Sequence, residues 1–476
     1  MKDLFHQFHK AISKEDAVWG WLGQRGHDSV GIDSLVPLQF ILSCDYGSDI
    51  EQLKKRSVIL SIEKYKKKSL YVRNKWSNQD LEKMFRGSFG KQVNKYFAAQ
   101  KKKINLVCYR SLNILEDMAR QNPEKIRILA SPLRLKNLFD NKIYLRNHIL
   151  PSLSLKKIPG ETLPLKKLQY RALVKKWGEK FVIQFAYGSS GDHTFIVKTK
   201  TECEEIKHSF PSQDVNITRY IDSIPLNINA CILSYPIRPD VVVSSPSIQI
   251  VGASEATYYP TIYCGNDYRA IKRVDGIIIK EVYSITKRIG LFMASFGFRG
   301  VFGLDFLVYK GYPYVIEINP RLQNSTQLLT ICQLNRGILP LVALHIMEFM
   351  NFQLPITKLR QLEQRLISPL EGAQIILYNR SGKKIRVNNL IKGGRYRLNN
   401  GAVNFIHTDK AIKGHNKKDE FLVASGIPGL NHLIERGGTL FKIQTLDEVV
   451  ENNCKKLNPR YSRIVKEVYR FINNSF

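Results

Sequence analysis

Four polar side chains in the second half of the chain have the types and spacing needed for phosphoryl chemistry. Glu317, Asn319 and Arg321 are spaced by two in the segment YVIEINPR, so in a strand they point to one face. Asp305 stands in the preceding apolar run GLDFLVY. Lys310-Gly311, between the two runs, predicts a tight hairpin turn. In such a hairpin Asp305 joins the same face from the neighbouring strand.

This face suits a magnesium ion and a transferring phosphoryl group. Carboxylate and carboxamide oxygens are hard ligands of the kind that Mg²⁺ binds together with triphosphate oxygens. We therefore expect Asp305, Glu317 and Asn319 to hold the metal, and Glu317, Asn319 and Arg321 to be catalytic. Arg321 would stand where negative charge develops. Ile316 is expected on the opposite face, and the alternative interpretation is a polar strand face that is solvated.

Strands and helices alternate in the first part of the chain, which predicts a parallel sheet with helices on its faces. The following residues, 132–150, read as helices, and 151–165, with three prolines, read as a linker. The apolar runs that we expect to be strands are Leu38–Leu42, Val58–Ile62, Ile104–Cys108 and Ile126–Ala130.

The later elements are more strand-rich and suggest a chain of several lobes, since 476 residues are too many for one ordinary core. We expect an N-terminal α/β domain over 1–130, a second domain over 131–352 with a lid lobe at about 165–225, and a β-rich lobe over 353–476. The expected elements are strand pairs over 180–200 and 217–235, helices over 275–297, 326–350 and Pro459–Phe471, and a hairpin over 372–387.

The hairpin at 303–321 resembles the magnesium-binding hairpin of the ATP-grasp superfamily, in which an acidic residue on one strand is followed by E-x-N-x-R on the next. Other segments follow in the family's order. The resemblance implies the following contacts to ATP: Lys142 at the α-phosphate; Gly188, Ser189, Ser190 and Gly191 in a glycine-rich loop over the β- and γ-phosphates; Arg219, Tyr220 and Ile221 in a hinge at the adenine; and Asn227 and Asn229 at the ribose.

Some positions depart from the family's pattern. Gln184 stands where most members have a second lysine, and its amide would reach adenine N7 or a phosphate without bringing a charge. The biotin-carboxylase branch is disfavoured, because Ser325 replaces its catalytic glutamate. The strand GAQIILYN also lacks the arginine that helps that branch to hold bicarbonate.

The resemblance implies a mixed α/β and α+β architecture: an ATP-grasp fold with an N-terminal parallel-sheet preATP-grasp domain. The C-terminal β-rich lobe is distantly similar to that of biotin carboxylases. The implied activity is an ATP- and Mg²⁺-dependent ligase that joins a carboxylate, of an amino acid or peptide, to an amine through an acyl phosphate. The alternatives are a catalytically altered ATP-binding protein, a biotin-carboxylase-like enzyme and a phosphotransferase.

The substrates and partners are less legible. Arg269, Lys272 and Arg299 flank the hairpin and are candidates for holding a carboxylate, and the segment 244–268 is expected to line the acceptor pocket. A net charge of +32 motivates a polyanion-binding surface, but no nucleic-acid recognition motif accompanies it. Seven scattered cysteines and the absence of a signal-peptide core or of a membrane-spanning apolar run favour the cytoplasm. A homodimer is left open.

Overall fold

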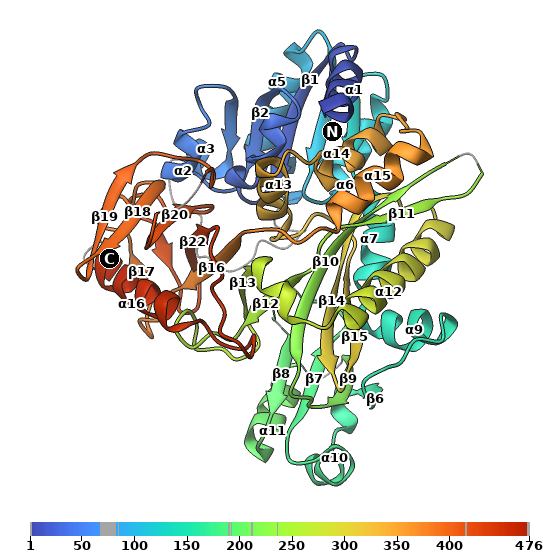
Figure 1. Ribbon diagram of the computed structural model, residues 1–476, viewed down its shortest axis with the longest axis vertical. Helices are drawn as coiled ribbons and strands as arrows, with labels where there is room; N and C mark the ends of the chain where they lie inside the picture. Colours follow the sequence, from blue (N-terminus) through green and yellow to red (C-terminus); the bar gives the residue numbers. More distant parts are fainter. Residues whose placement is uncertain are drawn as a thin grey trace.

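The computed structural model describes residues 2–66, 82–83, 85–188, 191, 193–210, 213–235, 237–414 and 417–473. The N-terminal domain, blue in Figure 1, lies at one end of the molecule, and a small lid of green strands lies at the other. Between them runs a long antiparallel sheet, which continues into the orange and red C-terminal lobe at the side. The predicted mixed architecture is confirmed.

The N-terminal domain is a five-stranded parallel sheet in the order β3-β2-β1-β4-β5. The strands are β1 (Ala17–Gly23), β2 (Leu38–Ser43), β3 (Val58–Ser61), β4 (Lys103–Cys108) and β5 (Ile126–Leu129). Four of them were predicted, and β1 was not, although it is the central strand. Its sequence AVWGWLG lacks a β-branched run, and Gly20 provides the space for the Phe40 ring, which would overlap a Cβ there.

The lid is a four-stranded antiparallel sheet in the order β6-β9-β7-β8. Its strands are β6 (Gly160–Pro164), β7 (Phe181–Phe185), β8 (Thr194–Val197) and β9 (Asp214–Arg219). The segment 151–165, predicted as a linker, thus contains a lid strand. The helices α10 (Tyr170–Trp177) and α11 (Lys200–Ser209) belong to the same lobe. A capping box begins α11, with Thr199 and Glu202 bonding each other's backbone N–H groups.

The long sheet has the order β15-β14-β10-β12-β13-β16-β22-β20-β18-β19, with β11 paired to β10. The hairpin predicted over 372–387 is wrong, because β16 pairs with β13 and β22 rather than with its successor β17. The strands are β10 (Ile224–Leu233), β11 (Asp240–Val243), β12 (Ser247–Val251), β13 (Tyr263–Asp267), β14 (Gly300–Tyr309), β15 (Tyr312–Asn319), β16 (Ala373–Tyr378), β18 (Gly394–Asn399), β19 (Ala402–His407), β20 (Glu420–Ala424) and β22 (Thr439–Thr445), and the short pair β17 (Ile385–Arg386) and β21 (Leu433–Ile434) stands apart.

Helices cover both faces of this sheet. The predicted amphipathic helix is α12 (Gly276–Ser295), which packs on β10, β11 and β15. The helix predicted over 326–350 is two helices, α13 (Thr326–Asn335) and α14 (Leu341–Phe349), because Gly337 takes a positive φ and Pro340 follows it. The remaining helices include α1 (Lys2–Ser13), α2 (Ser48–Glu51), α3 (Ile62–Lys66), α5 (Ser88–Ala99), α6 (Asn113–Gln121), α7 (Leu133–Asp140), α8 (Lys142–Tyr144), α9 (Leu150–Ser152), α15 (Ile356–Leu366) and α16 (Pro459–Asn473).

Two of the hydrophobic cores join parts of the chain that are far apart in sequence. The larger one runs from α12 through the long sheet to α16, so the C-terminal lobe shares its core with the middle of the chain. The second joins the strands β1 and β2 to the helices α13, α14 and α15. The N-terminal domain is therefore packed against the segment that follows the β14–β15 hairpin.

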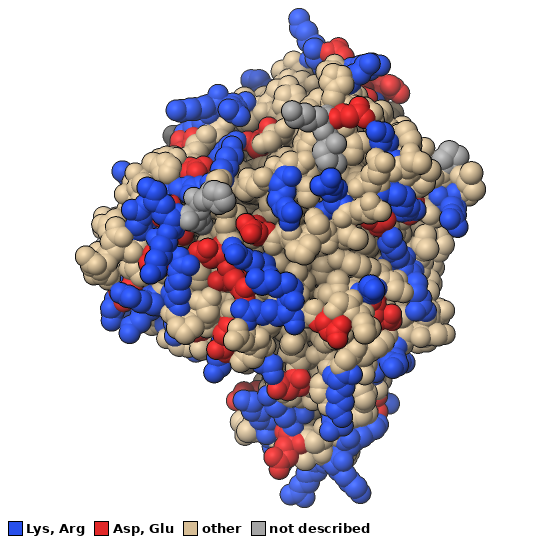
Figure 2. Space-filling model, in the orientation of Figure 1, with Lys and Arg blue, Asp and Glu red and all other residues tan. Residues whose placement is uncertain are grey.

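Basic side chains are spread over every lobe on the face shown in Figure 2, and acidic side chains are interspersed among them. On this face they do not gather into the continuous stripe that a nucleic-acid backbone would follow. Among the described residues, no helix has the length and apolar character needed to cross a bilayer.

Candidate active site

The β14–β15 hairpin has the predicted pairing. Asp305 lies directly opposite Glu317, and Gly303 lies opposite Asn319. On its other edge β14 pairs with β10, which places Asn227 opposite Asp305. Side chains from three adjacent strands therefore meet at Asp305.

A β-bulge in this hairpin corrects the prediction for Ile316. The register runs from Asp305 opposite Glu317 to Phe306 opposite Val315, so Ile316 is the extra residue. Ile316 lines the same cavity as Glu317 instead of pointing to the opposite face. A bulge of this kind re-aims side chains, and strict alternation along the strand does not predict it.

The Asp305 carboxylate is held by three amides. Its Oδ1 accepts hydrogen bonds from Asn227 Nδ2 at 2.6 Å and from Gln249 Nε2 at 3.1 Å. Its Oδ2 accepts one from Asn319 Nδ2 at 3.2 Å. Burial, together with repulsion by Glu317, raises the pKa of Asp305 to about 7 although these amides oppose the shift.

Glu317 is paired with Lys142 across the cavity. Lys142 Nζ lies 3.0 Å from Glu317 Oε1 and also donates to the backbone oxygen of Gly188 at 3.0 Å. The side chain of Lys142 is only 3% exposed. Asn141 caps the short helix α8, because its Oδ1 accepts from the N–H groups of Ile143 and Tyr144. This cap fixes the start of the segment that carries Lys142.

Arg321 connects the hairpin to the N-terminal domain. One guanidinium nitrogen donates to the Tyr109 hydroxyl at 2.9 Å, and the other donates to Asn319 Oδ1 at 3.0 Å. Tyr109 directly follows β4, at the carboxyl edge of the parallel sheet. β1 and β4 are the strands at which the strand order of this sheet changes direction, which is where ligands bind in open α/β sheets.

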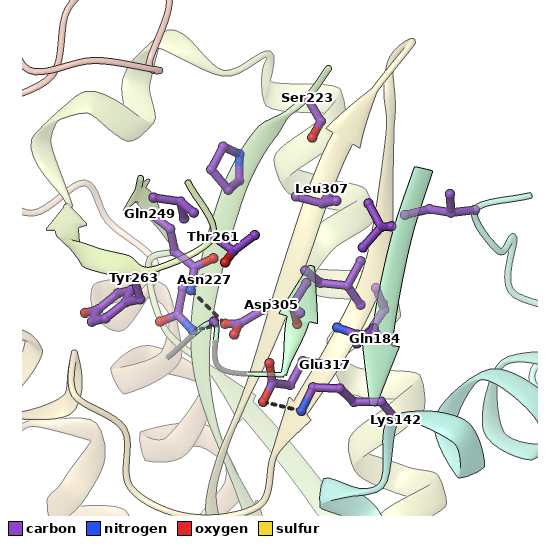
Figure 3. Close-up of a pocket in the computed structure, with 18 of the residues that line it drawn as sticks. Lys142, Gln184, Ser223, Asn227, Gln249, Thr261, Tyr263, Asp305, Leu307 and Glu317 are labelled. Carbon is purple, nitrogen blue, oxygen red and sulfur yellow. Dashed lines mark hydrogen bonds and ion pairs between the residues drawn. The ribbon is translucent and has the colours of Figure 1, made fainter. Parts of the chain in front are cut away.

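One cavity of about 400 Å³, a size typical of small-molecule sites, is lined by Lys142, Asn227, Gln249, Asp305, Glu317, Asn319 and Arg321. Tyr109 is not among its lining residues and contacts the site through Arg321. Figure 3 shows Lys142, Gln184 and Glu317 on one side of Asp305. The predicted ATP contacts that also line the cavity are Gly188, Gly191, Arg219, Tyr220, Ile221 and Asn227. The predicted contacts Ser189 and Ser190 lie outside the described residues.

Asn229 is placed differently from the expectation. It is 1% exposed and does not line the cavity. Its amide donates to Ser325 Oγ and accepts from Thr326 Oγ1 in the layer beneath Asn227. Asn229 is two positions from Asn227 on β10, so both side chains point to the same face of the strand. Asn229 lies further along the strand, next to the start of the helix α13.

The three cations proposed to hold a carboxylate do not line the cavity. Each is near a glutamate that does not line the cavity either: Arg269 near Glu371, Lys272 near Glu448 and Arg299 near the buried Glu348. The segment 244–268, by contrast, does line the cavity, through residues of β12, of β13 and of the loop between them. Its role at an acceptor stays a prediction.

Several lining residues were not predicted individually. Gln249 and Tyr263 lie within the segment 244–268, but nothing in its sequence distinguishes them. Cys454 and Lys455 come from the C-terminal lobe, and Lys455 forms an ion pair with Asp222 of the hinge at 2.7 Å. Tyr109, which contacts Arg321 without lining the cavity, was not predicted either, although it follows a strand of the predicted parallel sheet.

The residues present fit a magnesium ion. Asp305 and Glu317 supply two facing carboxylates, and Asn319 supplies an amide oxygen. Within the described part of the chain, no group of three or more His, Cys, Asp or Glu is arranged to hold a metal. Proteins usually bind Mg²⁺ through one or two carboxylates, and substrate phosphates and water complete the coordination. The donor set in this cavity fits that kind of magnesium site.

Magnesium binding is expected to depend on pH through Asp305. Its pKa of about 7 means that the carboxyl is largely protonated below that pH, and a metal must displace the proton. Calorimetry in buffers of different ionisation enthalpy should show release of about one proton at about pH 6, little release at about pH 8.5, and affinity that increases with pH. Asp305→Asn should abolish the release; release that persists in this variant would contradict the assignment.

Gly191 is expected to be required for the close approach of its backbone to Thr261. Its φ is +87°, and a Cβ on it would approach the Thr261 backbone oxygen to 1.9 Å. We expect Gly191→Ala to lower the affinity for ADP about tenfold, measured by calorimetry. Gly178→Ala is the matched control, because Gly178 has φ +92° with nothing within 4 Å of a Cβ. Equal losses in both variants would mean that contact with Thr261 is unimportant.

Comparison with known families agrees with this geometry. Residues 151–325 match the family model described as an ATP-grasp domain. This chain contains an ATP-grasp domain. The match includes the lid, the hinge and the hairpin, whereas Lys142 precedes it. No curated protein matches the chain.

Solved structures show that the ATP-grasp fold extends over nearly the whole chain. Biotin carboxylase from Campylobacter jejuni, solved as a β-γ-ATP complex, is 14% identical with a TM-score of 0.55, covering 90% of this chain and 87% of that one. Phosphoribosylamine–glycine ligase from Thermotoga maritima is 12% identical, with a TM-score of 0.54 and coverage of 95% and 96%. Carboxyaminoimidazole ribonucleotide synthase from Aspergillus clavatus, complexed with ATP, is 10% identical with a TM-score of 0.51, and the match covers 96% of this chain and 98% of that one. Identities this low show a shared fold.

Proposed function

We propose that this protein is an ATP-dependent ligase that joins a carboxylate to an amine through an acyl phosphate, using Mg–ATP. The observation that carries the proposal is the meeting of Asp305, Glu317, Asn319 and Arg321 with Lys142 around one cavity. Two of the similar structures are complexes with ATP or a β-γ-ATP ligand, which supports a nucleotide in the equivalent space. The proposal gives the class of reaction, and the screen described below identifies the two substrates.

Each group has a role in this scheme that its contacts support. Lys142 would exchange Glu317 for a nucleotide phosphate, since an ammonium pairs with either anion. Asp305, Glu317 and Asn319 would hold magnesium, which neutralises phosphate charge when bound. Arg321, already fixed by Tyr109 and Asn319, needs no rearrangement to stabilise charge on the transferred group.

A mass-resolved screen tests the proposal. The protein, Mg–ATP and a panel of amino acids and dipeptides should yield a product heavier than one substrate by the mass of the other minus water, with ADP and phosphate. A phosphorylated product without free phosphate would instead identify a phosphotransferase. A carboxylated product with bicarbonate is not expected, because Ser325 has no acidic group and its hydroxyl donates to Asn227 Oδ1.

A second candidate is a protein that binds the nucleotide without turning it over. Gln184 lines the cavity and brings no positive charge to it, and this feature favours the second candidate. Gln184→Lys separates the two. A ligase should retain or increase its turnover with the added charge, whereas a non-catalytic protein should gain affinity for ADP and still form no product.

A further inference from the structure

One side of the cavity is built from uncharged side chains. In Figure 3 Gln249, Thr261 and Tyr263 lie on one side of Asp305, and Lys142 lies on the other. This side adjoins the expected site of phosphoryl transfer without being part of it. We call it the amide compartment, and its residues are Gln249, Thr261, Tyr263, Asn266 and Asn324.

The wall of the amide compartment is held in place by its own hydrogen bonds. The Tyr263 hydroxyl donates to Asn266 Oδ1 and accepts from Gln374 Nε2 at 3.1 Å. Gln374 Nε2 also donates to the backbone oxygen of Asn324 at 3.0 Å, and Asn266 Nδ2 donates to Ser247 Oγ at 2.9 Å. Gln374 and Asn266 are fully buried. A wall fixed in this way loses little freedom when a ligand binds.

Other groups of the compartment remain available to a ligand. Gln249 uses its Nε2 on Asp305, so its Oε1 is left as an acceptor without a partner among the described residues. In the same described set, the side-chain amide of Asn324 and the hydroxyl of Thr261 have no hydrogen-bond partner either. The compartment therefore presents both donors and acceptors.

Charged ligand groups would be disfavoured here. Among the described residues of the compartment, none carries a charge at neutral pH, and burial raises the pKa of Tyr263 well above its ordinary value. A carboxylate placed between these amides would lose water without gaining a counter-charge. An ammonium would find the neighbouring carboxylate, Asp305, already accepting hydrogen bonds from three amides. An uncharged polar group would replace its hydrogen bonds to water with hydrogen bonds to the protein.

We propose that the amide compartment binds an uncharged hydrogen-bonding group of the acceptor substrate, such as a primary carboxamide. Its NH₂ would donate to Gln249 Oε1, and its oxygen would accept from Asn324 or Thr261. The inference rests on the proposed ligase function, because it takes the neighbouring carboxylates as the site of phosphoryl transfer. It goes further by naming the class of acceptor: the amine substrate carries a neutral polar group beside its nucleophile.

Fragment binding to the full-length protein tests this directly. Propionamide, propylammonium and propionate are nearly equal in size and differ in charge. Ligand-observed NMR titrations, at one ionic strength and with saturating Mg–ADP, should show propionamide binding at least about tenfold more tightly than either ion. Equal or tighter binding of propylammonium or propionate would overturn the proposal, and so would the absence of propionamide binding at the highest concentration that the protein tolerates.

Two substitutions localise the effect. Asn324→Asp is nearly isosteric and should reverse the preference between the fragments. Propylammonium should begin to bind, and the binding of propionamide should weaken about tenfold. Thr261→Val should weaken propionamide without any gain of propylammonium. Asn122→Asp, which adds the same charge at the exposed end of α6, is the control and should change nothing. An unchanged preference in Asn324→Asp would place the fragment elsewhere and contradict the assignment.

The nucleotide separates this test from the proposed function. If Mg–ADP fails to bind, the ligase proposal fails, and the titrations are then repeated without nucleotide. If propionamide still binds more tightly than the two ions in the absence of nucleotide, the result supports the amide compartment but not the ligase proposal. Binding of Mg–ADP without propionamide preference would overturn the inference and leave the ligase proposal standing.

Discussion

Arg321→Met is expected to lower kcat by about 10²–10³-fold and to leave the affinity for ADP within about threefold. The guanidinium is the positive charge that the hairpin holds beside Asn319, and its contacts with Tyr109 fix it before any substrate binds. Preorganised charge of this kind acts mainly on the transition state. ADP release with the substrates found in the screen measures kcat, and calorimetry measures the affinity.

Tyr109→Phe gives the graded control for this effect. It removes the hydroxyl that accepts from Arg321 and keeps the ring beneath the guanidinium, so kcat should decrease by only about tenfold. Full activity in Arg321→Met would exclude a catalytic role. A large loss of ADP affinity in that variant would instead assign Arg321 to ground-state binding of the nucleotide.

Glu317→Gln is expected to lower turnover by about 10³-fold or more, because it removes one of the two carboxylates that would hold magnesium. The substitution also leaves Lys142, 3% exposed, without its ion-pair partner. Breaking a buried pair from one side costs roughly 3 kcal/mol, so the free energy of unfolding should decrease as well. Chemical denaturation measures this second effect independently of activity.

A double variant separates catalysis from stability. Glu317→Gln with Lys142→Met removes both charges and should recover much of the lost free energy of unfolding, while turnover stays abolished. Glu161→Gln is the matched control, because the Glu161–Lys176 pair lies at the surface of the lid and its loss should be within about 1 kcal/mol. Recovery of turnover in the double variant would show that Glu317 acts only on the fold.

The hairpin was predictable because its information is local. A tight turn sets the register of the two strands, and spacing by two then places Glu317 and Asn319 on one face. The bulge at Ile316 was not predictable from the same pattern. An extra residue on one strand depends on how the sheet twists and on what packs against it.

The contributions of distant segments needed the tertiary structure. The contact of Asn227 with a ribose stays a prediction, and the structure adds that its amide donates to Asp305 and Gln323. Gln249 and Tyr263 enter the cavity because β12 and β13 pair beyond β10, a long-range order that no local pattern encodes. The central strand β1 was missed because Gly20 interrupts its strand-favouring residues, and the space that Gly20 leaves is taken by the Phe40 ring of the neighbouring strand.

The sequence by itself determined the strand–helix alternation of the first part of the chain and the shared polar face of the hairpin, since both follow from periodicity and short-range spacing. The ATP-grasp fold was what the resemblance of the hairpin and its neighbouring segments implied. It also singled out Lys142 and the glycine-rich loop through their order along the chain. Only the tertiary structure decided which cations face the cavity, because the pairing of Arg299 with the buried Glu348, away from the cavity, depends on contacts far apart in sequence. The amide compartment opposite Lys142 also depends on the tertiary structure. Its amides come from separate strands and one loop, which only the assembled sheet brings together.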